Sequence, residues 1–290
     1  MNILIYGLLV ILATSLMGSS FAVGKMGLAY FSPLFLAGLR FTIAGLLMTL
    51  WVRKKRHPAS TDDWMKVGVV GLFQTAAVMG CIFLSLRTIT AGETSILTFV
   101  NPLLVVIFGT WFLGLRYRFS QWIGVLIGFL GVVVTLGAHL QLKTGTILGL
   151  GSALSWAVAT ILVKKWGARF DIWVLTAYQM LIGGLLLLLA GVTVEDTKMI
   201  INSASVLIVL YLAIMGSIVQ FATWYYLLNR GDPGKTSAFL FLAPFFGVFS
   251  GWALLGEEAQ WYVYAGGFLI LVGIFLANWS FRGQKISYKQ

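Results

Sequence analysis

The sequence predicts an all-α membrane protein, with ten transmembrane helices arranged as two inverted five-helix repeats around a central cavity. Three observations predict this fold: the composition, ten long apolar segments and an internal repeat. The 290 residues are 59% hydrophobic and 10% charged, with a mean hydropathy of +0.94. Such a chain has too little polar surface to cover a water-soluble globule, so a lipid bilayer is the expected surroundings.

Ten segments are long and apolar enough to cross the hydrocarbon layer, which takes about 20 residues of helix. The first has no basic start and exceeds the length of a signal-peptide core, so it is interpreted as a retained helix. None shows the alternation of barrel strands. The links between them are too short for a soluble domain. The expected spans are 3–23, 33–52, 67–86, 92–113, 121–138, 145–163, 172–192, 205–228, 236–255 and 261–280.

The second half of the chain repeats the first at a distance of 142 residues. Each half holds five spans, and an odd number of crossings inserts the second copy upside down, as in solute carriers built from inverted repeats. We therefore expect two repeats, residues 1–139 and 140–290. The matched residues are Gly92, Thr94, Ser95, Pro102, Gly109, Leu113, Gly114, Gly124 and Gly131 with Gly234, Thr236, Ser237, Pro244, Gly251, Leu255, Gly256, Gly266 and Gly273.

The net charge of +11 is distributed unevenly over the links. With a cytoplasmic N-terminus, the outer links hold only Lys25, Arg87, Lys143 and Lys198. The inner segments hold fifteen basic residues: Arg53, Lys54, Lys55, Arg56, Lys66, Arg116, Arg118, Lys164, Lys165, Arg169, Arg230, Lys235, Arg282, Lys285 and Lys289. This follows the positive-inside rule and predicts both termini in the cytoplasm. The charge therefore needs no nucleic-acid partner. The basic cluster at residues 53–56 is also a candidate to bind anionic lipid headgroups at the cytoplasmic surface.

Two prolines occupy the same place in the two halves, Pro102 in the fourth span and Pro244 in the ninth. A proline inside a helix removes a hydrogen bond and displaces the carbonyl four residues earlier, here those of Thr98 and Leu240. A freed carbonyl at membrane depth is tolerated where protein or a watery cavity meets it. We expect kinks at both prolines beside a central cavity; a kink that only improves packing is the alternative.

The stretch around these prolines resembles the EamA repeat of the drug/metabolite transporter superfamily. The second half carries Ala243-Pro244, then Leu255-Gly256-Glu257, then Gly266 and Gly273. The first half keeps Asn101-Pro102 and Gly114 but has Leu115 and Arg116 in place of the glutamate. The resemblance implies ten helices around one cavity, and exporters or exchangers of amino acids, related metabolites or toxic compounds. Coupling to protons is likewise an expectation from the resemblance.

Intramembrane polar and aromatic side chains are the candidates for substrate contact, because binding pockets combine apolar walls with a few aimed polar groups. The candidates are Asn101, Gln74, Trp156, Trp224, Ser15, Thr98, Phe241 and Arg40, of which the first four are favoured. Arg40 is the charge that lies well inside a span. Two roles stay open for it, structural support through backbone carbonyls and contact with a substrate carboxylate.

All nine acids lie in links or at span ends, with Glu93 nearest the membrane interior. As an acid at a helix start, Glu93 is also explained by the helix dipole. His57, His139 and Cys81 lie apart in the sequence, so we expect no catalytic residues, no metal and no cofactor.

These features predict a secondary transporter that exports small organic solutes, amino acids or related metabolites, by alternating access. Its expected place is the bacterial cytoplasmic membrane, among membrane lipids, with proton coupling or exchange and as a monomer or homodimer. A sugar-phosphate or nucleotide-sugar exchanger of the same superfamily is the alternative, although such anions call for several cavity cations. An intramembrane enzyme or a passive channel is a remote alternative.

Overall fold

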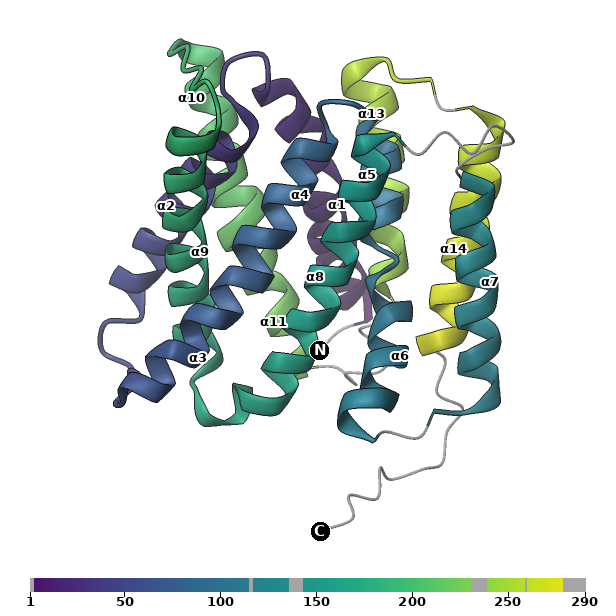
Figure 1. The fold of residues 1–290 in the computed structure, drawn as a ribbon, viewed down its shortest axis with the longest axis horizontal. Coiled ribbons are helices and arrows are strands. Elements are labelled where there is room, and N and C mark those ends of the chain that lie inside the picture. The colour runs from purple at the N-terminus through teal and green to yellow at the C-terminus, as the bar shows by residue number, and fades with distance from the viewer. Residues whose placement is uncertain (1–2, 115–116, 136–142, 231–238, 259, 279–290) are drawn as a thin grey trace.

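The computed structural model describes residues 3–114, 117–135, 143–230, 239–258 and 260–278. Regular structure in these ranges is helical, apart from one isolated bridge between Phe31 and Met199 (Figure 1). Helices dominate because the backbone of an apolar segment in lipid must satisfy its hydrogen bonds within the segment.

In the first half, the helices follow the predicted spans closely. The third crossing begins six residues before the predicted start, because Ser60 caps the helix by accepting a hydrogen bond from Asp63 N. The elements are α1 (Ile3–Gly27), α2 (Pro33–Trp51), α3 (Thr61–Gly71), η1 (Leu72–Ala77), α4 (Val78–Ser85), α5 (Ala91–Thr98), α6 (Asn101–Leu113) and α7 (Phe119–Thr135).

The second half has a similar succession of elements, with two additional short 3-10 helices, η2 and η4. Its ninth crossing is described only from residue 239, so the start of that predicted span lies outside the described residues. The elements are α8 (Thr144–Trp166), η2 (Gly167–Arg169), α9 (Ile172–Val194), α10 (Ser203–Leu210), η3 (Tyr211–Val219), α11 (Gln220–Arg230), η4 (Phe239–Phe241), α13 (Leu242–Leu255) and α14 (Trp261–Asn278).

Among the residues that the structure describes, seven helical stretches are long and apolar enough to cross a membrane. Three further apolar helices are shorter, at Phe119–Val134, Leu242–Leu255 and Trp261–Leu276. Large apolar side chains on their outer faces remain exposed, such as Leu126, Leu189 and Phe268. A water-soluble protein rarely exposes apolar surface on this scale. The chain is an integral membrane protein.

Contacts between links show which helix ends share a face of the molecule. Residues 30–32 pair with residues 198–200 through the backbone, and Lys25 reaches Glu257, so these ends lie together. At the other end, Lys55 donates to Asp171 at 2.8 Å. In Figure 1 the successive crossings run in alternating directions, with α3 and α4 forming one crossing and α5 and α6 another.

Helices from the two halves pack in reciprocal pairs. α2 packs on α9, and α7 on α14, at opposite edges of the molecule in Figure 1. The first helix of each half packs against the fourth crossing of the other, α1 on α13 and α8 on α5 and α6. Equivalent elements of the two halves thus make equivalent contacts.

Glycines let the backbones of α2 and α9 approach closely. A Cβ atom at Gly45 would lie 2.5 Å from Leu181 N, and one at Gly184 would lie 2.5 Å from Thr42 N. Because the obstructing atoms belong to the backbone, no side-chain movement could make room. Small residues at helix contacts are the usual means of close packing in membranes.

The two matched prolines lie in the first turn of a helix rather than in the middle of one. The fourth crossing breaks between Thr98 and Asn101, and Pro102 is the second residue of α6. Pro244 is the third residue of α13, directly after η4. A proline in a first turn removes no intrahelical hydrogen bond, which explains a break and restart in place of a kink.

A π-helical segment interrupts the third crossing of each half. It is η1 at Leu72–Ala77 in the first half and η3 at Tyr211–Val219 in the second. With the 142-residue offset, η1 falls within η3. Hydrophobicity alone did not predict either segment, because a π-helix and an α-helix are equally apolar. Such segments are often found at functional sites.

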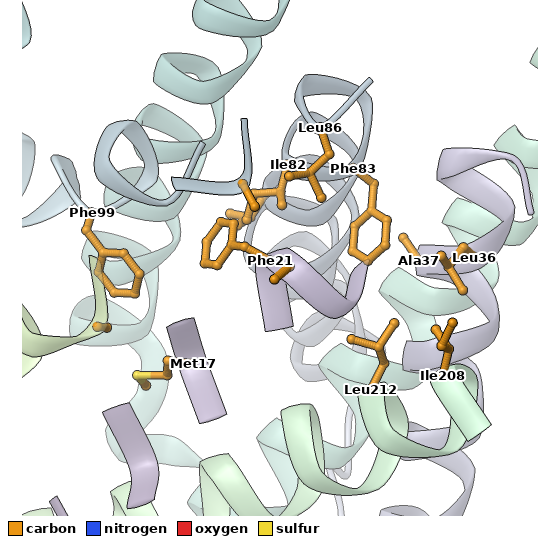
Figure 2. Packing of buried hydrophobic residues seen from close by; sticks show 14 of the residues in the cluster. Met17, Phe21, Leu36, Ala37, Ile82, Phe83, Leu86, Phe99, Ile208 and Leu212 are labelled. Carbon is orange, nitrogen blue, oxygen red and sulfur yellow. The ribbon is translucent and has the colours of Figure 1, made fainter. Parts of the chain in front are cut away.

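A buried apolar cluster joins both halves at the centre of the molecule. It includes Met17 and Phe21 of α1, Phe83 of α4, Phe99, and Leu212 of η3. Figure 2 shows Phe21 between Phe99 on one side and Ile82 and Phe83 on the other. This cluster surrounds the pocket described below.

We expect Gly45→Ala to destabilise the protein by about 1–3 kcal/mol, the range for overpacking, because the added Cβ would push α2 away from α9. Thermal unfolding of purified protein in detergent measures this. Gly7→Ala is the matched control, since a Cβ there would meet no atom within 4 Å. Equal unfolding temperatures for both variants would contradict the close approach.

Candidate functional site

A small pocket lies between helices of both halves. Its cavity volume is about 50 Å³, or about 420 Å³ of unfilled space when the open solvent at its mouth is included. Its walls come from α1, α2, α4, α5, α8 and α11, and are mainly apolar with a few polar groups. The lining residues are Met17, Ser20, Phe21, Arg40, Met79, Ile82, Phe83, Thr98, Phe99, Trp156 and Gln220. A hollow of this kind, apolar with convergent polar groups, is the usual form of a small-molecule site.

Helical spacing places the apolar part of the wall. Met17 and Phe21 are four residues apart and share one face of α1, while Met79 and Phe83 do the same on α4. Phe99 contributes from the break that follows α5, and its ring lies 6.2 Å from that of Phe21 between centroids. Figure 2 shows Met17, Phe21 and Phe99 gathered on one side of the cluster.

Arg40 supplies the charge of the pocket. It is the eighth residue of α2, about 10 Å along the helix from its start, and only 4% exposed. Its Nε donates to Ser217 Oγ at 2.9 Å, and its Nη2 donates to the carbonyl oxygen of Gly216. The guanidinium also lies 4.7 Å from the centre of the Phe41 ring. Two neutral acceptors and an aromatic face thus hold this cation in place.

The π-helical segment η3 presents these acceptors. Ser217 Oγ donates to the carbonyl oxygen of Leu212, five residues earlier, which leaves its lone pairs for Arg40. Gly216 is required for the approach: a Cβ there would lie 2.5 Å from Ser20 Oγ and 3.2 Å from Arg40 Nη2. The widened helical turn of η3 and the absence of a side chain at Gly216 together make room for the guanidinium beside its two acceptors.

Polar contacts join α8 to the fourth crossing across the pocket. Thr98 Oγ1 and Ser152 Oγ lie 2.8 Å apart, and Ser152 also donates to the carbonyl oxygen of Gly149. The Trp156 and Phe99 rings meet edge to face with centroids 5.5 Å apart. These contacts fix the Trp156 ring as one wall.

The structure brings three of the predicted site residues together: Arg40, Thr98 and Trp156 all line the pocket. Phe99 and Gln220, which are also polar or aromatic residues of the spans, line it with them. The signal for these residues was the polar or aromatic side chain within an apolar span.

Four other predicted residues lie elsewhere. Ser15 donates to the carbonyl oxygen of Leu12 in its own helix, as serines in membrane helices often do. Trp224 is buried in the central cluster, while Gln74 lies in η1 and Asn101 at the start of α6. None of these four is among the described residues that line the pocket. The side chain of Phe241 lies outside the described residues.

Sequence reasoning missed the pocket face of α1 and α4, which carries Met17, Ser20, Phe21 and Phe83. Both helices are apolar on every side, so periodicity could not separate a pocket face from a lipid face. The four-residue spacing of Met17 and Phe21 was visible, but nothing in the sequence marked it as facing a hollow.

At one end of the molecule an ion pair ties three helix ends together. Lys25, in the last turn of α1, donates to Glu257 Oε1 at 2.7 Å and to the carbonyl oxygen of Ile89 at 3.0 Å. Glu257 also accepts hydrogen bonds from Ala91 N at 3.0 and 2.9 Å. The carboxylate therefore caps the start of α5, where the helix dipole favours negative charge.

Glu93 has a separate structural role. Its carboxylate accepts from Thr90 N at 2.9 Å, while Thr90 Oγ1 accepts from Glu93 N at 3.0 Å, and together they form a capping box. Among the described residues, no group of three or more His, Cys, Asp and Glu side chains could hold a metal ion.

The profile of the EamA-like transporter family matches this chain twice, over residues 4–137 and 143–279. The uncharacterized transporter YvbV of Bacillus subtilis (strain 168) is 30% identical, over 92% of this chain and 90% of its own length. A protein of Salmonella typhimurium (strain LT2) named "probable amino-acid metabolite efflux pump" is 28% identical, over 95% of both chains. One protein crystal structure aligns with a TM-score of 0.66 at 24% identity, covering 94% of this chain and 96% of the other.

We expect Lys25 and Glu257 to be coupled by about 1 kcal/mol, because both are partly buried and their hydrogen bond is charge-assisted. A double-mutant cycle of Lys25→Met and Glu257→Gln, followed by thermal unfolding in detergent, measures the coupling. Glu258→Gln is the matched control, since Glu258 is an exposed neighbouring acid. Strictly additive effects of Lys25→Met and Glu257→Gln would refute the coupling.

Proposed function

The chain belongs to the EamA-like transporter family, and from this we propose that it is a secondary carrier that exports small organic solutes, amino acids or related metabolites, across the bacterial cytoplasmic membrane. The observation that carries the proposal is the pocket at the meeting of helices from both halves, where Arg40, Thr98 and Trp156 converge. Carriers built from repeats bind their substrates at such an interface near mid-membrane.

We propose that the two segments matched by the family profile are inverted halves of one carrier. The reciprocal packing of α1 on α13 and of α8 on α5 and α6 supports this, as do the alternating helix directions. Two equivalent halves can rock against each other and expose a single site to one side at a time.

The ion pair between Lys25 and Glu257 supports alternating access. It joins the ends of α1 and α13 to the start of α5, so opening toward that face must separate these helices and break the pair. The repeat equivalents toward the opposite face are Lys165 and Leu115, which offer no carboxylate. The Lys25–Glu257 pair thus has no counterpart at the equivalent positions, although Lys55 and Asp171 join the two halves at the other end.

The name of the Salmonella relative supports amino acids or related metabolites as the substrate class. Sugar phosphates and nucleotide sugars fit less well, because a doubly charged phosphate calls for several cations. Arg40 is the sole basic residue among the described lining residues. Coupling to protons, or exchange of one solute for another, and a monomeric or homodimeric state complete the proposal.

Trp156→Ala should reduce substrate flux at least fivefold, because it removes a wall of the pocket, whereas Trp111→Ala should not. Trp111 is 71% exposed on α6 and faces away from the pocket, which makes it a matched control. The measurement is flux into proteoliposomes with labelled amino acids, nucleosides and sugar phosphates, with and without a pH gradient. Undiminished flux in Trp156→Ala would remove the pocket from the transport path.

Single cysteines in a Cys81→Ser background should report the topology. With cytoplasmic termini, a membrane-impermeant thiol reagent added to whole cells should label Lys198→Cys and Thr88→Cys but leave Ser60→Cys unlabelled until the membrane is permeabilised. Residue 198 pairs with residue 32 through the backbone, and Lys25 binds the carbonyl oxygen of Ile89, so positions 198 and 88 lie at the same end of the molecule and their labels must agree. External labelling of Ser60→Cys would reverse the proposed orientation.

A further inference from the structure

We propose that the pocket selects monocarboxylates with an apolar body, and that Arg40 contacts the carboxylate. This inference rests on the proposed function, and narrows its solutes from amino acids or related metabolites to those related metabolites that carry a carboxylate and no ammonium group. It separates organic monoanions from zwitterionic amino acids, which carry an additional ammonium group.

The first step is the unbalanced charge of Arg40. The guanidinium is 4% exposed, and in the described part of the chain its hydrogen-bond partners are the neutral Ser217 and Gly216. Ion pairs among the described residues involve Lys25, Lys55, Lys66 and Arg169, but not Arg40. A buried charge without a counter-charge is costly, and an anion in the pocket would reduce that cost.

The second step is the free donor capacity of the side chain. Arginine has five N–H groups in a planar fork. Nε and Nη2 of Arg40 make its two hydrogen bonds, while Nη1 has no partner among the described residues. Arg40 also lines the pocket. A carboxylate can take up such free donors through charge-assisted hydrogen bonds.

The third step is the absence of an acidic side chain among the described lining residues, which could have bound a solute's ammonium group. None of the described lining residues is acidic. Three acids in the described part serve helix ends: Glu93 completes a capping box, Glu257 binds Lys25, and Glu195 accepts from Leu34 N. A zwitterion would therefore place its ammonium group among neutral oxygens and rings, whereas a monoanion matches the single positive charge.

The fourth step concerns the remainder of the solute. Around Arg40, the walls are the side chains of Met17, Phe21, Phe83 and Phe99, with the Trp156 ring beside them. Hydroxyl-rich solutes would leave polar groups without partners against these walls, which costs free energy. An aromatic or branched aliphatic chain instead buries apolar surface there.

The test uses three ligands of nearly equal shape on the unmodified full chain. Isothermal titration calorimetry in detergent at pH 7 compares 3-phenylpropionate, its neutral amide 3-phenylpropionamide, and zwitterionic phenylalanine. We expect the carboxylate to bind at least tenfold more tightly than either of the others. Arg40→Gln should abolish the difference between acid and amide, while Arg87→Gln, at an exposed end position, should preserve it.

Equal affinities for acid and amide, tighter binding of phenylalanine, or no binding of any of the three would overturn the inference. The comparison of ligands on the unmodified chain decides this even when Arg40→Gln fails to fold. Saturable proteoliposome flux of an amino acid that phenylpropionate does not inhibit would also overturn it, while leaving the carrier function intact. No saturable flux for any solute tested, monocarboxylates included, would instead contradict the proposed function.

Discussion

The burial of one full positive charge inside an apolar helix bundle is the constraint on which the centre of this protein depends. Arg40 is only 4% exposed, so neighbouring helices must present oxygen atoms to most of its polar surface. The π-helical turn of η3, the missing side chain at Gly216 and the hydroxyl of Ser217 meet that need together. The pocket lies where these groups leave part of the guanidinium free.

The two halves share packing but not charge. Gln179 on α9 is the repeat equivalent of Arg40 when the register of the repeat is shifted in this region. Gln179 is buried, and it packs beside Gly71, the residue that precedes the π-helical segment η1. Glu257 has Leu115 as its equivalent. Close helix packing is needed at both places because it supports the bundle, whereas charge at one place is enough for binding or for an ion pair. The matched positions in the two halves thus keep the small residues that packing needs, whereas the charged residues differ between them.

The placement of the predicted site residues follows a physical pattern. Arg40, Thr98 and Trp156 reached the pocket, and each differs chemically from the apolar residues around it. Ser15 and Trp224 differ equally, yet one bonds its own helix and the other packs in the core. A polar or aromatic residue in a span therefore indicates that its side chain has a partner. The sequence does not determine whether this partner is the same helix, a neighbouring helix or a ligand.

The sequence by itself determined the membrane environment and the approximate places of the apolar helices, because apolar length and short links are properties of the chain read in order. The 142-residue repeat predicts a duplicated plan in the same way. Tertiary structure alone decided which faces of α1 and α4 line the pocket, where the π-helical segments lie, and that Lys25 meets Glu257. The physical reason is that helices apolar on every side carry no directional signal in lipid. Their orientation is fixed by contacts between residues far apart in the chain.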